Sequence, residues 1–423
     1  MDYNIIIQNV NFKNKGGESA RFIPCVFVMK VVLAYSGGLD TSICIKWLEE
    51  TYNAEVITLT LDIGQERSDL RFIEEKAKNI GAVKTYSINA KEEFVRDYIN
   101  PSIKANALYE GKYPLSTAIG RPLISKWLVK IAEKENADAV AHGSTGKGND
   151  QVRFELAIRS LNPGLKIIAP ARQWNLNRET AKIYAKKHKI PIGSSSQYSI
   201  DENLWGRSIE AGSLEDLMSE PSDEVYSWTV SPENALDRAE FIELEFDEGI
   251  PVRLNGKKMN EVRLIQKLNQ LGGKHGIGRI DMVEDRLIGI KSREIYECPA
   301  ATIIIEAHRD IERLTLTREE NLFKELIDSK WAQLVYFGQW YEPLKRDLDS
   351  FINESQHMVS GSVRLRLYKG LASVTGRESP NSLYDMGLAA YDMKDVFNHK
   401  LAEGFIRLWG LPSEIAGRRK KGK

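Results

Sequence analysis

One stretch limits the fold of this chain more than any other: residues 31–42, Val-Val-Leu-Ala-Tyr-Ser-Gly-Gly-Leu-Asp-Thr-Ser. An apolar, β-branched run ends in two glycines, and apolar residues at helical spacing follow directly, which predicts a strand, a sharp turn and a helix. Glycine lets the backbone approach a ligand closely, and the unpaired amides and dipole of a helix start favour an anion. Ser36, Thr41 and Ser42 add hydroxyl donors, and Asp40 can hold a metal that accompanies phosphate. We therefore interpret the turn as a phosphate-binding loop.

An ordinary strand–helix turn capped by a serine is the alternative, and it is common in α/β proteins. The spacing matches neither the Gly-x-x-x-x-Gly-Lys-Ser/Thr loop of P-loop NTPases nor the Gly-x-Gly-x-x-Gly dinucleotide fingerprint. Residues 36–42 instead resemble the pyrophosphate loop of the N-type ATP pyrophosphatases, which cleave ATP between its α and β phosphates. That resemblance implies a pyrophosphate-binding role.

Strands and helices alternate after Lys30. Beyond the first strand, we expect strands over 54–62, 83–88, 137–142 and 166–169. We expect helices over 70–80, 92–108 with Pro101 as a candidate break, 121–136 with Pro122 in the first turn, and 154–160. Right-handed crossovers then give a parallel, Rossmann-like α/β sheet with ligands at the carboxyl ends of its strands.

A second glycine-rich loop follows the strand predicted over 137–142. Residues 141–155 read Ala-His-Gly-Ser-Thr-Gly-Lys-Gly-Asn-Asp-Gln-Val-Arg-Phe-Glu. Three glycines in six residues, with Lys147 among them, suit a phosphate or another polar ligand. Asp150 and Arg153 lie near the start of the next helix, where their spacing also fits a plain intrahelical ion pair.

These two loops together resemble the argininosuccinate synthase family. The resemblance runs from about residue 30 to about residue 408, and the second loop is its more specific part. Further matching segments are Ala-Leu-Tyr-Glu-Gly-Lys-Tyr at 107–113, Ser-Ile-Asp-Glu-Asn-Leu at 199–204, Gly-Lys-His-Gly-Ile-Gly-Arg-Ile-Asp at 273–281 and Ile-Lys-Ser-Arg at 290–293.

The resemblance implies an ATP-dependent ligation of citrulline to aspartate in arginine biosynthesis, through a citrulline adenylate, with AMP and pyrophosphate as products. It implies that Mg²⁺ accompanies ATP, with no separate metal site, and that Asp40, Lys147 and Asp150 act in catalysis. The implied ATP-binding residues are Ala34, Tyr35, Ser36, Gly37, Gly38, Leu39, Asp40, Thr41, Ser42, Leu61 and Gly143.

The same resemblance implies the two amino-acid sites. Aspartate would be held by Thr145, Asn149 and Asp150. Citrulline would be held by Tyr113, Thr117, Asn149, Arg153, Ser199, Ser208, Glu284 and Tyr296. A neutral ureido group needs hydroxyl and amide partners, and an amino-acid head group needs one acid and one base, which Glu284 and Arg153 supply.

Several of these residues have simpler alternatives. Tyr113 and Tyr296 could be half-buried aromatics that anchor loops, Ser199 could cap a helix, and Glu284 could belong to a solvated ion pair. The chain also departs from the family at three positions. Ala118 replaces a common serine, Asp285 an asparagine and Glu294 a glycine, and the last two add negative charge near the expected citrulline pocket.

The second half has a different pattern. Residues 241–246 alternate strictly, and we expect strands there and over 252–257, 302–305, 362–368 and 371–375, with helices over 261–271 and 397–408. Aromatic residues over 331–340 suit a core. We expect an N-terminal extension or alternative start (1–28), an ATP-binding domain (29–195), a catalytic and multimerisation α+β domain (196–392), and a C-terminal helix with a basic tail (393–423).

Composition narrows the function classes. The 423 residues exceed one ordinary core, and 59 basic residues balance 59 acidic ones, so no overall field attracts nucleic acid or a membrane. Three widely separated cysteines (Cys25, Cys44 and Cys298) suit a reducing cytoplasm. A tRNA-thiolating or similar adenylating enzyme, which needs suitably placed cysteines, and a non-catalytic nucleotide-binding regulator are the alternatives. The family resemblance implies a homotetramer.

Overall fold

The computed structural model describes residues 28–65, 69–174, 178–191, 197–391 and 396–421. The expected extension over 1–28 and the cysteine at position 25 therefore lie almost entirely outside the described residues. Within the described ranges, no helix is both long enough and apolar enough to cross a membrane.

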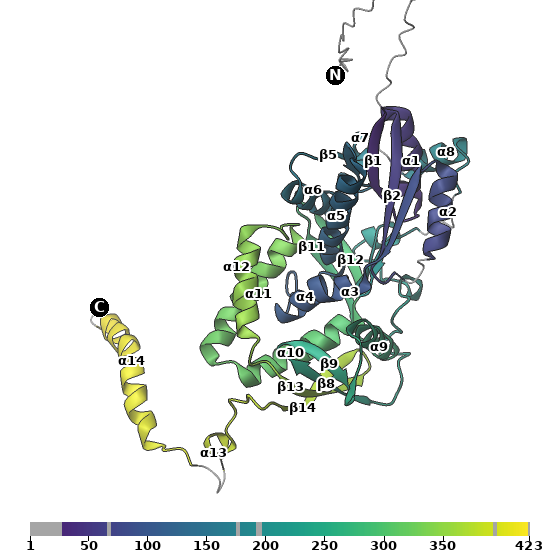
Figure 1. Ribbon diagram of the computed structural model, residues 1–423. Coiled ribbons are helices and arrows are strands. Elements are labelled where there is room, and N and C mark those ends of the chain that lie inside the picture. The colour runs from purple at the N-terminus through teal and green to yellow at the C-terminus, as the bar shows by residue number, and fades with distance from the viewer. Residues whose placement is uncertain (1–27, 66–68, 175–177, 192–196, 392–395, 422–423) are drawn as a thin grey trace, which may run out of the picture.

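A parallel five-stranded sheet forms the first half, in the order β3-β2-β1-β4-β5. Its strands are β1 (Met29–Ala34), β2 (Ala54–Asp62), β3 (Lys84–Asn89), β4 (Ala139–Ala141) and β5 (Lys166–Ile168). Alternate residues of β1 face opposite sides: Val31 and Leu33 pack in one apolar cluster with α1 (Leu39–Tyr52), and Val32 in another with α5 (Ser116–Glu135). Helices on both faces confirm the α/β fold (Figure 1).

The other helices of this half are α2 (Leu70–Ile80), α3 (Lys91–Phe94), α4 (Asn100–Lys104), α6 (Asn149–Leu161), α7 (Pro170–Gln173) and α8 (Arg178–Lys187). A π-helical turn, Val95–Ile99, joins α3 to α4, so the helix runs past Pro101, which sits in the first turn of α4 and does not break it. The expected end at residue 108 was wrong, because the helix ends at Lys104.

Two expected helix starts were also wrong. Helix α5 begins at Ser116, five residues before the expected start, so Pro122 lies inside the helix. Helix α6 begins at Asn149, so Asn149, Asp150 and Arg153 belong to its first turns. Apolar spacing locates a buried face well, whereas polar first turns such as these leave little periodic signal.

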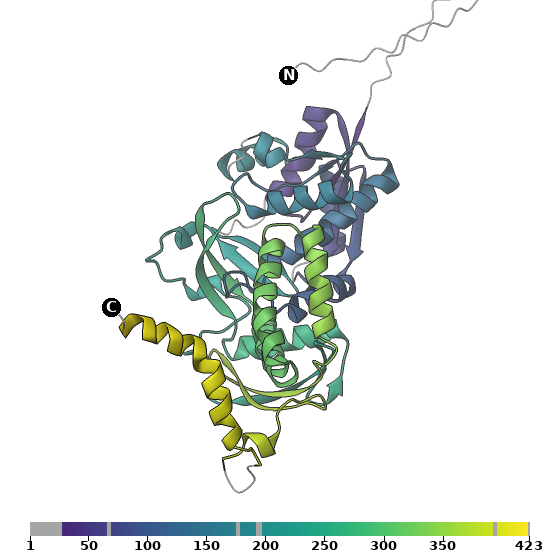
Figure 2. The same ribbon diagram turned by 90° about the vertical axis from the view of Figure 1, so that its left-hand side faces the viewer.

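A four-stranded antiparallel sheet, ordered β11-β12-β7-β6, lies between the parallel sheet and the lower part of the molecule (Figures 1 and 2). Its strands are β6 (Ser199–Asn203), β7 (Gly206–Glu210), β11 (Arg279–Asp285) and β12 (Lys291–Glu297). Short 3₁₀ turns at Gly212–Glu215 and Asp223–Val225 follow β7. We call this the substrate sheet, since one of its faces carries many of the candidate residues.

A second five-stranded sheet, which is antiparallel, has the order β10-β9-β8-β13-β14. It contains β8 (Glu240–Asp247), β9 (Ile250–Leu254), β10 (Lys257–Lys258), β13 (Gly361–Tyr368) and β14 (Leu371–Glu378). It is accompanied by α9 (Glu261–Lys274), α10 (Pro299–Thr315), α11 (Arg318–Tyr336) and α12 (Pro343–Ser355). This confirms an α+β second half.

The expected strand over 302–305 was wrong, because these residues lie in α10. A short apolar run does not distinguish a buried strand from a buried helix. Here Pro299 occupies the first turn, and the buried positions Ala300, Ile304, Ala307 and Ile311 recur at helical spacing. The aromatic stretch behaves as expected, since Trp331 is fully buried.

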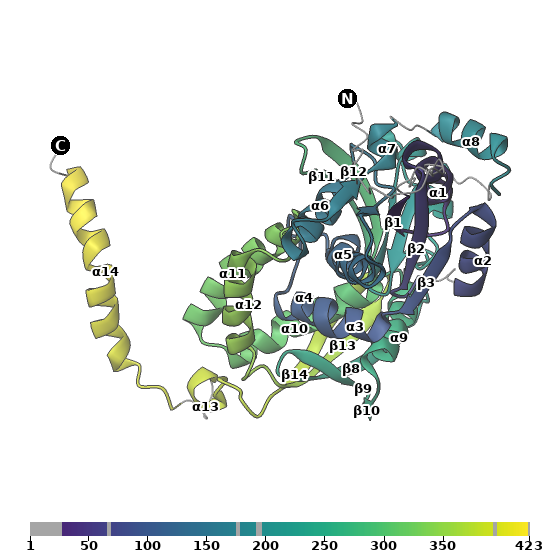
Figure 3. The same cartoon turned by 45° about the horizontal axis from the view of Figure 1, so that its top comes forward.

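The C-terminal part extends away from the body. The short helix α13 (Met386–Ala389) and the long helix α14 (Lys400–Lys421) lead away from the second sheet, and α14 stands apart in Figures 1 and 3. The expected helix over 397–408 is thus longer and begins slightly later.

Candidate active site

The first glycine loop has the geometry expected of a phosphate-binding turn. Gly37 has a φ of +78°, which favours glycine, and extended Gly38 precedes the first residue of α1. The Ser36 Oγ lies 3.1 Å from the Thr41 Oγ1, and both groups are at the surface of the loop. Asp40 is exposed in the first turn. These groups can face an anion at the helix start.

Other contacts revise details of this loop. Ser42 is buried, and its hydroxyl lies 3.1 Å from the Tyr35 hydroxyl, so it supports the loop from beneath. The Lys76 Nζ, on α2, donates to the Gly37 carbonyl at 2.7 Å. The contact of Lys76 with the loop was not predicted from the sequence, because Lys76 lies 39 residues from Gly37. The Leu61 carbonyl at the end of β2 accepts a hydrogen bond from the Gln65 side chain at 3.2 Å.

The two glycine loops meet at one edge of the parallel sheet. Strands β1 and β4 are parallel neighbours, so the loops that follow them leave the same edge. A Cβ added to Gly143 would lie 3.0 Å from the Thr41 Cγ2 and 3.8 Å from the Thr41 backbone nitrogen. Glycine therefore permits the second loop to pack against the first. Thr145 and Lys147 are exposed on the second loop.

One face of the substrate sheet gathers four of the expected citrulline residues. Side chains alternate along each strand, and the register pairs Tyr296 with Ser208 and Glu284 with Ser292. On this face lie Ser199 from β6, Ser208 from β7, Glu284 from β11 and Tyr296 from β12.

Glu284 lies at the centre of a buried tyrosine network. Its Oε2 accepts from the Tyr296 hydroxyl at 2.6 Å and its Oε1 from the Tyr336 hydroxyl at 2.5 Å. The Asn149 Nδ2 donates to the same Tyr336 hydroxyl at 2.8 Å. Burial raises the pKa of Glu284 from its usual value. Since only 3% of Glu284 is exposed, the solvated-ion-pair alternative is wrong.

The simpler alternatives given for Tyr113, Tyr296 and Ser199 are also wrong. Tyr113 and Tyr296 are fully buried, with ring centroids 4.0 Å apart, so they are not half-buried anchors. The Tyr113 hydroxyl accepts from the Thr117 backbone at 2.9 Å, and the Thr117 Oγ1 lies 3.1 Å from the Ser208 Oγ. Ser199 begins a strand, so it does not cap a helix.

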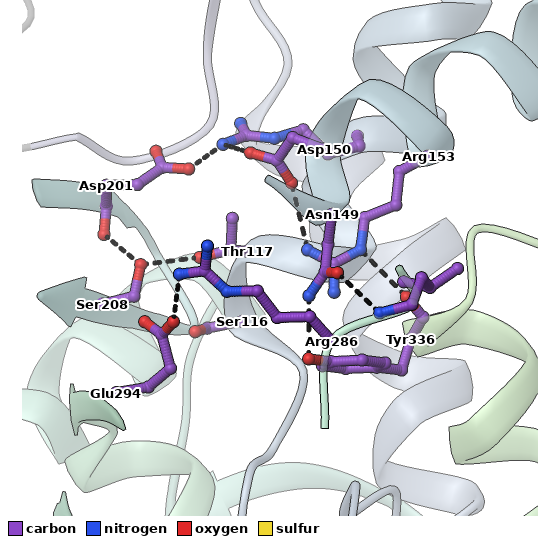
Figure 4. Close-up of polar contacts among 12 residues, drawn as sticks. Ser116, Thr117, Asn149, Asp150, Arg153, Asp201, Ser208, Arg286, Glu294 and Tyr336 are labelled. Carbon is purple, nitrogen blue, oxygen red and sulfur yellow. Dashed lines mark hydrogen bonds and ion pairs between the residues drawn. The ribbon is translucent and has the colours of Figure 1, made fainter. Parts of the chain in front are cut away.

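Asp150 bridges two arginines (Figure 4). Its Oδ1 lies 3.0 Å from the Arg153 Nη1 and its Oδ2 lies 2.7 Å from the Arg121 Nη2, and Arg121 also pairs with Asp201. Burial opposes ionisation of Asp150, but the two guanidinium groups outweigh it and lower the pKa of the carboxyl. The pair Asp150–Arg153 is therefore part of a larger cluster and not an isolated intrahelical bridge.

Arg153 is fixed by the second half of the chain. Its Nε donates to the Tyr336 carbonyl at 3.0 Å, and its guanidinium lies over the Tyr336 ring. Four residues of this region were not predicted as site residues from the sequence: Arg121, Asp201, Arg286 and Tyr336. Arg121 follows Thr117 by one helical turn, which is a usable signal once α5 is placed correctly. Tyr336 ends α11, in an aromatic stretch that the sequence predicts as core, and Trp331 of that stretch does pack in the core.

The three residues that depart from the family pattern have different surroundings in the structure. Ala118 is buried in the first turn of α5. Asp285 is exposed and pairs with Lys291 at 2.7 Å. Glu294 is buried and pairs with Arg286 at 2.8 Å. Among the described residues, no group of three or more His, Cys, Asp or Glu side chains could hold a metal ion.

This arrangement defines a class: an N-type ATP pyrophosphatase-like nucleotide-binding domain joined to an α+β domain that carries a face of polar side chains. Residues 30–191 match the family described as "Arginosuccinate synthase N-terminal HUP domain", and residues 198–416 match the "Arginosuccinate synthase C-terminal domain". The chain belongs to the argininosuccinate synthase family.

Curated relatives agree over nearly their whole length. The chain is 56% identical over 388 residues to an argininosuccinate synthase of Pyrococcus furiosus, covering 92% of this chain and 94% of that protein. It is 53% identical over 396 residues to one of Symbiobacterium thermophilum, covering 93% and 99%. A solved U34-tRNA thiolase from Methanococcus maripaludis is 16% identical, with a TM-score of 0.26, covering 40% of this chain and 59% of that one.

Proposed function

We propose that this protein is an ATP-dependent ligase that joins L-citrulline to L-aspartate and releases AMP and pyrophosphate. The observation that carries the proposal is a chain of contacts: the second glycine loop packs on the first at Thr41, and Asn149 and Arg153, which follow the second loop, both bond to Tyr336. Tyr336 in turn donates to Glu284. Family membership and the high coverage of argininosuccinate synthase relatives support the same reaction.

In the first step, the citrulline ureido oxygen attacks the α-phosphorus of ATP, and the bond from that phosphorus to the bridging oxygen breaks. Pyrophosphate leaves on the amides of residues 37–40 and the hydroxyls of Ser36 and Thr41, with Lys147 offsetting charge. Mg²⁺ bound to ATP supplies further neutralisation, and exposed Asp40 is the group suited to reach it. Backbone groups near Leu61 would contact adenine.

In the second step, the aspartate amine attacks the activated ureido carbon, AMP leaves with the former ureido oxygen, and a proton is lost from the amine. Thr145, Asn149 and Asp150 lie on the loop and helix start that would orient aspartate. Glu284 and Arg153 would hold the citrulline head group, with Tyr113, Thr117, Ser199, Ser208 and Tyr296 around the rest. Alignment provides most of the rate gain in such a transfer.

The thiolating alternative is weaker on physical grounds. Burial raises the pKa of the Cys44 thiol well above its usual value, and Cys44 lies on the buried face of α1, in the core. Burial likewise raises the pKa of Cys298 to about 12. A nucleophilic or metal-binding cysteine needs the opposite environment.

We further infer a homotetrameric, cytoplasmic enzyme of arginine biosynthesis. Helix α14 supports self-association, because several of its apolar residues are more than half exposed, among them Phe405 and Trp409.

The test is pyrophosphate release from purified protein supplied with ATP, Mg²⁺, citrulline and aspartate. We expect steady release that requires both amino acids, with argininosuccinate formed in equal amount. Release that is independent of either amino acid would contradict the ligase assignment.

A further inference from the structure

The turn between β11 and β12, residues 286–290, is attached to the second glycine loop. The Leu287 backbone nitrogen donates to the Asn149 Oδ1 at 3.0 Å, and the Arg286 Nη1 lies 3.4 Å from the Lys147 carbonyl. Arg286 and Leu287 therefore join the substrate sheet to the loop that we assign to aspartate.

Arg286 is held in place by groups of the substrate sheet. Its Nε donates to the Ser292 Oγ at 2.8 Å, and its Nη2 pairs with Glu294 at 2.8 Å and with Glu210. The Ser292 hydroxyl also donates to the Glu294 Oε1 at 2.9 Å. Only 8% of the Glu294 side chain is exposed, against 39% for Glu210, so Glu294 forms the more desolvated half of this anchor.

We propose that Glu294 is a positioning residue for aspartate: it seats Arg286, and Arg286 fixes the second glycine loop through the Lys147 carbonyl. The proposal rests on the proposed ligase function. It gives Glu294 a role in that reaction, although Glu294 is not among the proposed substrate contacts. Figure 4 shows Arg286 reaching from the Asn149 side of the site to Glu294.

Asn149 is shared by the two proposed amino-acid sites, but other citrulline residues are held by contacts that do not involve Arg286. Arg153 is fixed by Asp150 and the Tyr336 carbonyl, and Tyr113 accepts from the Thr117 backbone. Loosening Arg286 should therefore affect aspartate binding much more than citrulline activation.

The charge of Glu294 should be sensitive to pH near neutrality. Burial and the carboxylates of Glu210 on β7 and Glu284 on β11 raise the pKa of Glu294 to about 8, and Arg286 opposes them. Other titratable or charged groups on this side of the site are Tyr296 on the same strand, Asp201 on β6, Lys147 on the docked loop, and Asp150 and Arg153 on the helix that follows it. Ionisation above that pKa strengthens the grip on Arg286, so aspartate should bind more tightly as pH rises.

The experiment compares Glu294→Gln, Arg286→Lys and Arg286→Met with the unaltered protein. Citrulline-dependent exchange of pyrophosphate into ATP, without aspartate, measures the first step, and argininosuccinate formation measures the KM for aspartate. We expect Arg286→Met to raise that KM by about tenfold or more above pH 8, with a smaller rise for Glu294→Gln and Arg286→Lys. The KM for citrulline in the exchange should stay within about twofold.

Lys291→Met is the matched control. It removes a charge from the same hairpin, but Lys291 is exposed and pairs with exposed Asp285. We expect both KM values to be unchanged. As the pH rises from about 7 to about 9, the KM for aspartate should fall in the unaltered protein and in Lys291→Met. In Glu294→Gln the fall should be smaller or absent.

Two results would overturn the proposal while leaving the ligase function intact. One is an equal rise of both KM values in the variants. The other is an effect of Arg286→Met with an unchanged aspartate KM and pH profile in Glu294→Gln, which would assign the anchor to Glu210. Absence of citrulline- and aspartate-dependent turnover in the unaltered protein would instead remove the function itself.

Discussion

At the scale of single residues, the candidate site is built from shared charges. Asp150 neutralises both Arg121 and Arg153, Glu294 and Glu210 share Arg286, and Glu284 takes its two hydrogen bonds from tyrosines. Removing one partner leaves a buried or half-buried charge unpaired, and that cost exceeds the value of a surface bridge. Each substitution here should therefore be conservative in shape.

Asp150→Asn tests the proposed role of the Asp150 carboxylate in aspartate binding. The amide keeps the side-chain shape but no longer neutralises two guanidinium groups, and it has no charge for the aspartate ammonium that we propose it binds. We expect kcat/KM for aspartate to fall by about a hundredfold or more, while citrulline-dependent exchange of pyrophosphate into ATP stays measurable. Asp201→Asn, which removes the other acid on Arg121, is the control and should have the smaller effect. Equal loss of both half-reactions in Asp150→Asn would refute the division of roles.

At the scale of elements, the first loop depends on one backbone angle. Gly37 has a positive φ, and a Cβ there would lie 3.1 Å from Ile73 on α2, whereas Gly38 is extended with a φ of −70°. Gly37→Ala should cost about 1–2 kcal/mol, which lowers the Tm of the ligand-free protein by a few degrees. Gly38→Ala should leave that Tm nearly unchanged. Thermal melts of both variants without ATP measure the difference, and equal melting temperatures would contradict a strained Gly37.

Part of the fold and of the candidate site could be predicted from the sequence, and part could not. Strand β2 and helix α2 have the predicted bounds, because each has a strong apolar pattern and a turn residue at its end. The glycine loops were found because their chemistry is contiguous in the chain. The contacts of Tyr336 and Arg286 join segments far apart in sequence, so no local pattern could reveal them, whereas Arg121 was missed because the start of α5 was misplaced. Helix α10 was misassigned because its apolar run fits two periods.

At the scale of the whole molecule, a buried polar cluster joins the two halves. Lys324 on α11 donates to the Lys104 carbonyl at the end of α4, and it pairs with Asp328 at 2.7 Å and Glu312 at 3.0 Å. Lys324→Met removes the ammonium group that faces both buried carboxylates, and we expect it to destabilise the protein by about 3–5 kcal/mol. Lys330→Met, on the exposed side of the same helix, is the control. Denaturant unfolding measures the loss, and similar stability of both variants would show that the cluster does not hold the halves together.

Helix α14 is the surface through which we expect copies of the chain to associate. Leu401, Phe405, Leu408 and Ile415 recur at helical spacing and are each at least half exposed, so the helix has an apolar stripe that its own chain leaves uncovered. Burying such a stripe against another copy is favoured by the hydrophobic effect, because water leaves the apolar surface. Phe405→Asp with Leu408→Asp should therefore lower the mass measured by light scattering. Glu403→Ala with Arg407→Ala removes an exposed ion pair from the same helix and should leave the mass unchanged. An unchanged mass in the Asp variant would exclude α14 as the surface of association, while the parallel sheet, which lies far from α14 in Figure 1, should keep its fold in either case.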